Sequence, residues 1–140
     1  MRVLVAGATG QLGVDLVNLL RRQGLEVAAP DAQRLDLLRP QTVRDAVRDA
    51  RPHWVINCAA YTQVDRAEQE RETAFAVNRD GARVLAEAAA AAQAWMLQVS
   101  TDFVFSGQSS APYTEDDPTG PLGVYGQSKR DGELAVVVGG

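Results

Sequence analysis

A phenol and an ammonium group lie four residues apart near the end of the chain, in the run Tyr125-Gly-Gln-Ser-Lys129. Residues with this spacing share one face of a helix, so both groups can act on the same substrate atom. A free tyrosine has a pKa of about 10, and a neighbouring lysine cation favours the phenolate and lowers that pKa. The pair is therefore a candidate catalytic unit in which Tyr125 protonates the alkoxide that forms during reduction of a ketone. Lys129 is also the only lysine among 14 basic residues.

Three glycines at the other end of the chain form the run Gly7-Ala-Thr-Gly10-Gln-Leu-Gly13, which follows an apolar strand and opens a helix. This context is typical of a dinucleotide-binding loop. Gly7 permits a tight turn, Gly10 lets the backbone approach a pyrophosphate, and Gly13 allows close packing of helix against sheet. The Gly-x-x-Gly-x-x-Gly spacing is the short-chain dehydrogenase form, so NADPH or NADH is the expected cofactor, and Lys129 would also hold its nicotinamide ribose. A structural turn that binds no cofactor is the alternative.

Residues near the end of the second expected strand bear on the choice of cofactor. Asp31 lies 18 residues beyond Gly13, where an acid can bind the adenosine ribose and favour NADH. Arg34 could instead meet the 2′-phosphate of NADPH, so both cofactors stay open. Asp36 and Leu37 could line the adenine. A turn residue and a solvated acid are the structural alternatives for Asp31 and Asp36.

Polar residues follow the fourth expected strand, in the run Ser100-Thr101-Asp102. Doubly wound folds bind ligands at this carboxyl end of the strands. The Thr101 hydroxyl could donate a hydrogen bond to a substrate carbonyl and polarise it, although it could also merely cap the strand end. Cys58 is expected as a small core residue and His53 as a surface or capping residue. One cysteine and one histidine exclude a His/Cys metal cluster.

Strand and helix patterns alternate along the chain and predict an α/β fold: a Rossmann-type, doubly wound parallel sheet with helices on both faces. Continuous apolar runs such as Val3-Leu4-Val5 indicate strands that are buried on both sides. Residues 106–122 are rich in Gly, Ser, Pro and Asp and predict a loop. The expected strands span residues 2–6, 27–29, 54–56 and 95–99. One helix is expected to follow Gly13 and to end at Gly24, a second to begin near Pro40, and two more to span residues 73–92 and 125–138.

Length and composition limit the class of protein. The 140 residues fit one domain. With 46% hydrophobic and 23% charged residues, and no apolar run near ~18 residues, no membrane association is expected. The net charge of -4 argues against a nucleic-acid-binding surface. The N-terminus lacks the pattern of a secretory signal, so we expect a cytoplasmic protein.

The chain resembles the dTDP-4-dehydrorhamnose reductases of the extended short-chain group along its whole length. The most specific parts are the Thr-x-Val-Asp and Ser-Thr-Asp-aromatic-Val-Phe blocks. The likeness rests on the glycine run and on Leu35-Asp36, Asn57-Cys-Ala-Ala-Tyr-Thr-Gln-Val-Asp-Arg-Ala-Glu68, Val77-Asn78, Ser100-Thr-Asp-Phe-Val-Phe-Ser-Gly107, Pro121-Leu-Gly-Val-Tyr-Gly-Gln-Ser-Lys129 and Gly132-Glu133.

This resemblance implies the reduction of dTDP-4-dehydro-L-rhamnose to dTDP-L-rhamnose, the last step in making a sugar donor for bacterial cell-surface polysaccharide. Tyr125 would be the proton donor and Lys129 its partner, while Thr101 and Asp102 would hold the dTDP-sugar. The resemblance also implies that the dinucleotide site is lined by Gln11, Leu12, Ala60, Tyr61 and Thr62.

Members of this group continue for roughly as many residues again, which supply further strands and a smaller domain for the nucleotide sugar. We therefore expect residues 1–140 to form an NAD(P)-binding Rossmann domain, truncated before the last strands of the sheet, with the substrate domain absent and turnover impaired. The free edge of the fourth strand would then be a template for self-association, as in a homodimer.

Two other functions are open at this point. One is a non-catalytic NADP-binding regulatory subunit that resembles the methionine adenosyltransferase β-subunit. The other is a nucleotide-sugar epimerase or dehydratase, which would need an extra acid beside Thr101, a place that Asp102 could fill.

Overall fold

A four-stranded parallel sheet forms the centre of the computed structural model, which describes residues 1–139. Its strands are β1 (Arg2–Ala6), β2 (Glu26–Ala28), β3 (Trp54–Asn57) and β4 (Trp95–Gln98). The strand order is β2-β1-β3-β4, so the chain passes to one side of β1 and then to the other. Doubly wound folds bind ligands in a crevice where such an order reverses, which predicts a ligand crevice at the carboxyl ends of β1 and β3.

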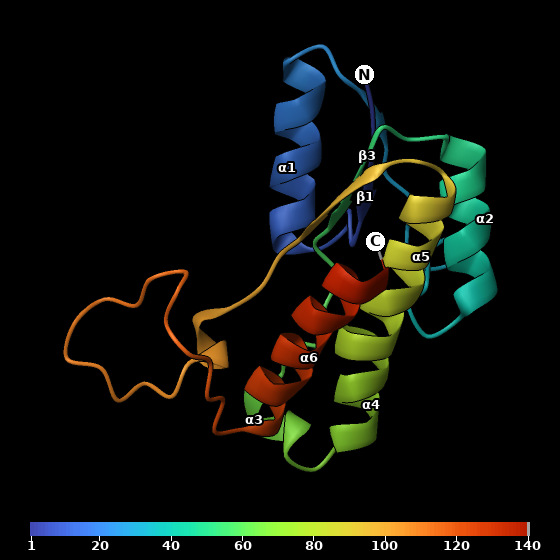
Figure 1. Ribbon diagram of the computed structural model, residues 1–140. Coiled ribbons are helices and arrows are strands. Elements are labelled where there is room, and N and C mark those ends of the chain that lie inside the picture. The colour runs from blue at the N-terminus through green and yellow to red at the C-terminus, as the bar shows by residue number, and fades with distance from the viewer. Residues whose placement is uncertain (140) are drawn as a thin grey trace.

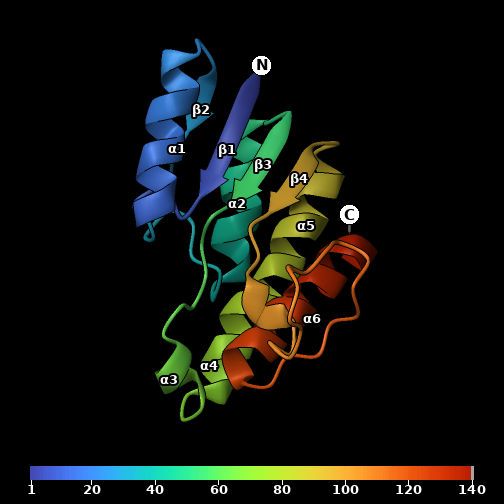
Figure 2. The same ribbon diagram turned by 90° about the vertical axis from the view of Figure 1, so that its left-hand side faces the viewer.

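Helices cover both faces of this sheet (Figures 1 and 2). Helix α1 packs on one face, and α2 and α5 pack on the other. The predicted Rossmann-type, doubly wound architecture is therefore confirmed. The helices are α1 (Gln11–Arg22), α2 (Pro40–Ala50), α3 (Val64–Ala67), α4 (Arg71–Phe75), α5 (Ala82–Ala91) and α6 (Val124–Gly139), together with the π-helical segment η1 (Ala76–Gly81) and the 3-10 turn η2 (Asp102–Val104).

The packing of strand β1 explains its continuous run of apolar residues. Successive side chains of a strand point to opposite faces. Val3 and Val5 pack with Val17 of α1, whereas Leu4 packs on the opposite face with Val47 of α2. Both faces of β1 are thus buried, as the sequence predicted.

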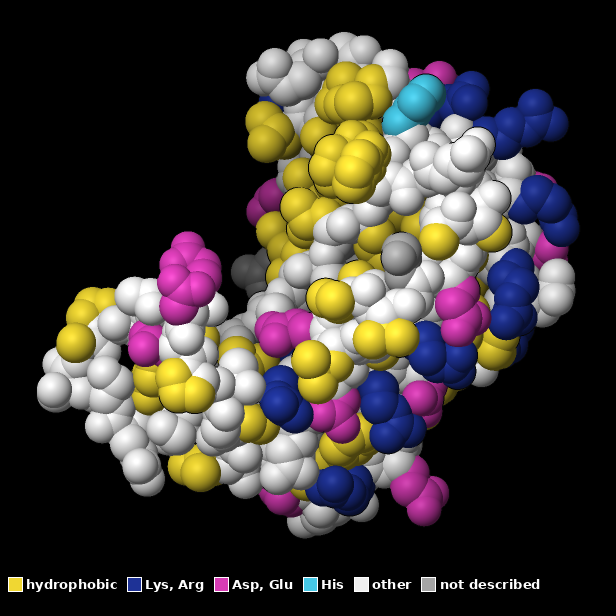
Figure 3. All heavy atoms as spheres, viewed as in Figure 1, with side chains coloured by type: hydrophobic (Ala, Val, Ile, Leu, Met, Phe, Trp, Pro, Cys, Tyr) yellow, Lys and Arg dark blue, Asp and Glu magenta, His cyan; other side chains and the backbone are white. Residues whose placement is uncertain are grey.

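Strand β4 forms a free edge of the sheet, as expected. The side chains of Trp95 and Leu97 are 71% and 46% exposed. The Trp95 ring stacks on Trp54 of β3, with 6.1 Å between the ring centroids. Apolar side chains gather on this part of the surface, near the single histidine, in Figure 3. The edge and its adjoining apolar face are therefore open in the described part of the chain.

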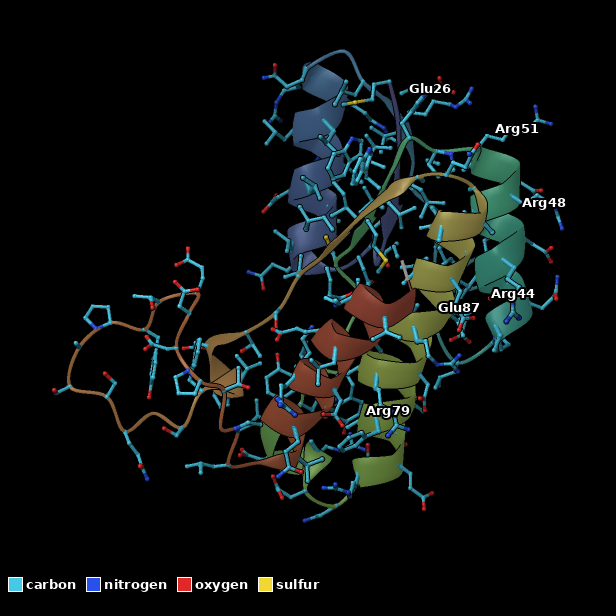
Figure 4. The ribbon with its side chains drawn as sticks, in the orientation of Figure 1. Glu26, Arg44, Arg48, Arg51, Arg79 and Glu87 are labelled. Atoms are coloured by element: carbon cyan, nitrogen blue, oxygen red, sulfur yellow. The ribbon has the colours of Figure 1, made fainter. Side chains whose placement is uncertain are left out.

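Charged side chains cover the outer surfaces of α2 and α5. Arg44 of α2 faces Glu87 of α5, with 4.0 Å between their charged groups (Figure 4). Arg48 pairs with Asp45 within α2 at 2.6 Å. Such exposed pairs contribute little stability, about 0–1 kcal/mol each, so they mark a solvated surface rather than a site. No helix within residues 1–139 is long and apolar enough to cross a membrane.

The structure differs from the sequence prediction mainly between β3 and β4. Residues 73–92 were expected to form one α-helix, but α4, η1 and α5 follow one another without a break, and η1 has π-helical geometry. A π-turn holds one more residue than an α-turn, and composition carries no signal for it. The short helix α3 lies where no helix was expected, and β2 begins one residue earlier than predicted.

Candidate functional site

The glycine run forms a tight turn between β1 and α1. Gly7 adopts a left-handed backbone with φ of 73°, and the Gly10 N–H donates to the Gly7 carbonyl oxygen at 3.0 Å. A Cβ on Gly13 would lie 2.1 Å from that same oxygen, so only glycine permits this packing. A Cβ on Gly7 would lie 2.6 Å from the Ala59 nitrogen, which shows that the loop after β1 touches the loop after β3.

The amino end of α1 fits an anionic group. Gly10 is the N-cap residue of α1, and no side chain caps its free backbone N–H groups. A Cβ on Gly10 would meet only the Gly7 oxygen, at 3.3 Å, and would otherwise project into open space. Free N–H groups and the helix dipole favour a phosphate at such a place. Gln11 and Leu12 are exposed at the start of the helix, where the resemblance places them in the dinucleotide site.

The loop after β3 carries Ala60, Tyr61 and Thr62, the other expected dinucleotide residues. The Tyr61 hydroxyl donates to a Glu70 carboxylate oxygen at 2.6 Å. This hydrogen bond raises the pKa of Tyr61 and, together with Arg66, lowers the pKa of Glu70. The Tyr61 side chain is thus tied to Glu70, and the roles of Ala60, Tyr61 and Thr62 toward a dinucleotide stay predictions.

The residues expected around the adenosine mostly close local turns. The Asp31 carboxylate accepts from the backbone N–H groups of Gln33 and Arg34, both at 3.1 Å. Asp36 forms an ion pair with Arg39 at 2.9 Å. Leu37 is 7% exposed and packs in the core beside α2 and α5. Asp31 lies exposed in a turn after β2, and its role toward a ribose stays a prediction, as do the adenine contacts of Asp36 and Leu37.

Helix α6 carries the predicted catalytic pair, and its geometry is well defined. Lys129 is 5% exposed, and its Nζ donates to the Val99 carbonyl oxygen at the end of β4, at 2.7 Å. Burial lowers the pKa of Lys129, an effect that the nearby Glu133 carboxylate partly opposes. The Tyr125 ring packs edge-on against Phe103, with 5.6 Å between the ring centroids. The lysine is thus anchored at the carboxyl end of the sheet, beside the ligand crevice.

A cavity of about 380 Å³ lies next to Tyr125. Asp102 and Phe103 line one side of it, and Tyr125 and Gly126 line another. Thr101 is not in contact with this cavity; its hydroxyl oxygen accepts from the Phe103 N–H at 3.2 Å and caps the turn η2. A larger hollow of about 1080 Å³ lies at the amino-terminal end of the strands, between α2 and α5, but none of the predicted site residues line it.

Cys58 and His53 take the structural roles expected for them. Cys58 packs with the core on the α1 face, and burial raises the pKa of its thiol, which makes it a poor nucleophile. The His53 Nδ1 accepts from the Arg2 N–H at 2.9 Å, next to the start of β1. Residues 1–139 contain no cluster of three or more potential metal ligands.

Three polar residues that the sequence left without a role hold this site together. A Glu68 oxygen accepts from the Val124 N–H at the start of α6, at 2.8 Å. Asn78 and Ser128 are buried and bonded to each other at 2.9 Å. Their partners lie 50 or more residues away along the chain, so local patterns could not reveal them; only the Val77-Asn78 block in the resemblance pointed to Asn78.

The parallel sheet, the glycine turn before α1 and the tyrosine–lysine pair on α6 define a Rossmann-type domain of the short-chain dehydrogenase/reductase type. More particularly, the chain belongs to the family described as RmlD substrate binding domain, which it matches over residues 1–139.

Several known proteins are similar to this chain in sequence and in fold. The chain is 52% identical to a dTDP-4-dehydrorhamnose reductase of Streptomyces griseus over 97% of its length, which is 45% of that protein. It superposes with a TM-score of 0.94 on a dTDP-4-dehydrorhamnose reductase of Clostridium acetobutylicum, at 38% identity, covering 99% of this chain and 49% of that one. The TM-score is also 0.94 for the Bacillus anthracis reductase in complex with NADP, at 39% identity, covering 98% and 49%. The chain thus spans about half the length of these relatives.

Proposed function

We propose that residues 1–140 form the NAD(P)-binding domain of a dTDP-4-dehydrorhamnose reductase. The observation that carries this proposal is the placement of Lys129, which is buried on α6 and bonded to the backbone just beyond the end of β4. Relatives of that name match nearly the whole chain, and one of them is solved with NADP. NADPH or NADH is therefore the proposed cofactor.

The glycine turn and the β3 loop would hold this cofactor. The free N–H groups after Gly10 would bind its pyrophosphate, and Gln11, Leu12 and Ala60 to Thr62 would line its two sides. Asp31 would bind the adenosine ribose, with Asp36 and Leu37 toward the adenine. Bound nicotinamide would supply the hydride for the reduction.

The catalytic residues would act on the oxygen of the sugar ketone. Tyr125 would donate its phenolic proton to that oxygen as negative charge develops there. Lys129 would favour the phenolate that remains and hold the nicotinamide ribose. The Thr101 hydroxyl, which donates to Asp102 Oδ1 at 3.2 Å, would turn to donate to the substrate carbonyl instead. Asp102, which lines the cavity beside Tyr125, would contact the dTDP-sugar.

The free edge of β4 supports a further proposal, that the chain forms a homodimer. Trp95 and Leu97 are exposed there, and an unpaired edge strand offers backbone groups to a second copy.

Oxidation of NADPH with dTDP-4-dehydro-L-rhamnose, followed by absorbance, tests the proposed reaction. Wild type is compared with Tyr125→Phe, which keeps the ring packing on Phe103 and removes the proton donor. We expect both proteins to bind NADPH and only wild type to oxidise it. Binding without oxidation by wild type would restrict the role of these residues to cofactor binding, and equal oxidation by both proteins would contradict the role of Tyr125.

A further inference from the structure

The hollow of about 1080 Å³ at the amino-terminal end of the strands is rich in arginine. Among the described residues, four arginines and one carboxylate, that of Glu87, line it. Arg44 and Arg48 pair with carboxylates on α5 and α2. Arg2 and Arg51 form no ion pair within residues 1–139. The hollow therefore keeps positive charge on a chain whose net charge is -4.

Arg2 and His53 are held in place by the backbone around them. The Arg2 Nε donates to the Arg51 carbonyl oxygen at 2.9 Å, and its terminal nitrogens have no partner in the described part of the chain. The His53 Nδ1 accepts from the Arg2 N–H at 2.9 Å, so the proton of a neutral imidazole lies on Nε2. Arg2 thus offers two amino groups to a ligand, and His53 offers one N–H. A guanidinium held in this way suits phosphate, which it can bind through two parallel hydrogen bonds.

The backbone around the hollow adopts an unfavourable conformation at two places. Residues 1–139 contain two non-glycine residues with positive φ, Arg51 at 44° and Gln93 at 55°, and both line this hollow. They lie at the carboxyl ends of α2 and α5, where glycine is preferred. Such residues cost free energy and cluster at functional sites. Each helix end also carries about half a negative charge, which the two arginines without an ion pair outweigh.

Both tryptophans of the chain line the same hollow. Trp54 and Trp95 begin β3 and β4 and stack with 6.1 Å between their ring centroids, and Trp95 is 71% exposed. In Figure 3 the single histidine lies between apolar side chains on one side and basic side chains on the other. Aromatic rings stack nucleobases, and neighbouring arginines bind their phosphates. The two kinds of group in this hollow therefore match the two halves of a nucleotide.

We propose that this hollow is a second nucleotide site, in which Arg2, Arg51 and His53 bind the phosphates of a nucleoside diphosphate and Trp95 stacks its base. It lies where β1, β3 and β4 begin, whereas the glycine turn follows the carboxyl end of β1. The length of the sheet separates the two places. The inference does not depend on the proposed function, because no residue of the glycine turn lines the hollow.

Calorimetric titration with guanosine diphosphate (GDP) tests this site, because GDP is neither the proposed cofactor nor a dTDP-sugar. We expect saturable binding that quenches the tryptophan fluorescence, since both tryptophans line the hollow. Pyrophosphate should bind roughly tenfold or more weakly than GDP, because it has no base to stack. No binding of GDP, or binding that leaves the tryptophan fluorescence unchanged, overturns the proposal.

Four variants locate the binding. Arg2→Gln and Arg51→Gln should each bind GDP about tenfold more weakly, because a charged hydrogen-bond donor is lost. Arg22→Gln is the matched control: Arg22 is exposed at the end of α1, lies outside the hollow, and its variant should bind GDP as wild type does. Trp95→Leu should bind GDP about tenfold more weakly and pyrophosphate as wild type does. Circular dichroism checks that each variant is folded.

Three outcomes of these measurements would contradict the proposal. Equal weakening by Arg2→Gln and Arg22→Gln would show an effect of overall charge rather than a site. Quenching that accompanies a change of oligomeric state in sedimentation would report on the β4 edge instead. Tighter binding of a polyglutamate peptide than of GDP would assign the hollow to an acidic protein partner.

Discussion

Lys129 donates a 2.7 Å hydrogen bond from its Nζ to the carbonyl oxygen of Val99, and this bond joins α6 to the end of β4. A second tie lies one helical turn further along, where Ser100 donates to Glu133. Lys129 is 5% exposed, so its cation is held by the protein rather than by water. The structure therefore holds the Lys129 charge at the carboxyl ends of the strands. Removing this charge should change both NADPH binding and the pH dependence of stability.

Lys129→Met keeps most of the buried volume and removes the charge and its hydrogen bond. We expect NADPH to bind roughly tenfold or more weakly, because the proposed bond from Lys129 to the nicotinamide ribose is lost and a hydrogen bond from a charged group is worth about 1.5–3 kcal/mol. Calorimetric titration measures this change. Arg130→Met is the control, since it removes a neighbouring charge whose side chain is 40% exposed, and it should bind NADPH as wild type does.

The buried cation also makes stability depend on pH. The pKa of Lys129 lies below its ordinary value of 10.5 because burial disfavours the charged form. Between the folded pKa and 10.5 the unfolded chain binds more protons, so the free energy of unfolding rises with pH in that window. The folded state gains its full stability from neutral Lys129 above pH 10.5. This gain in the free energy of unfolding is lost as the pH falls through the folded pKa.

Urea unfolding at a series of alkaline pH values tests this dependence. The difference in unfolding free energy between wild type and Lys129→Met should shift in favour of wild type as pH approaches 10.5. A difference that is constant across the alkaline range, or that moves the other way, would show that Lys129 is not disfavoured by burial.

Two glycines of the cofactor turn should respond differently to alanine. Gly13→Ala places a Cβ 2.1 Å from the Gly7 oxygen, so the turn must shift, and both folding stability and NADPH binding should be lost. Gly10→Ala projects mainly into open space, so the melting temperature should change little while NADPH affinity falls roughly tenfold or more. Thermal melts and titrations measure the two effects. Gly120→Ala, whose Cβ would meet only Ser106 at 3.7 Å, should alter neither.

The open edge of β4 predicts self-association. Leu97→Lys places a charge on the exposed apolar face at this edge and should shift the chain from dimer to monomer, as sedimentation velocity would show. Leu38→Lys alters a side chain of similar exposure, 52%, away from β4, and should remain dimeric. A monomeric wild type at the same concentration would rule out the proposed homodimer.

The sheet and the position of Tyr125 and Lys129 on one helix could be predicted because their signals are local. The run Val3-Leu4-Val5 predicts a strand buried on both faces, and the glycine spacing predicts the turn that follows it. Lys129 lies one helical turn from Tyr125, so the sequence alone places both on one face of α6. Each of these inferences needs only neighbouring residues.

The contacts that hold the site together could not be predicted in this way. Asn78 is 17 residues from Tyr61 and 50 from Ser128, and no periodic pattern connects them. The π-turn that presents Asn78 has no compositional signature. The hydrogen bonds of Asp31 and the burial of Leu37 likewise depend on turn geometry and tertiary packing, which become visible only in the structure.

Calorimetric titration of the chain with NADPH and NADH tests the central claim most directly. The account predicts saturable binding of at least one of them, at one site per chain, and binding that is roughly tenfold or more weaker in Gly10→Ala. No binding of either cofactor to a chain that circular dichroism shows to be folded would contradict the assignment of the Gly7–Gly13 turn and the Lys129 helix to a dinucleotide site.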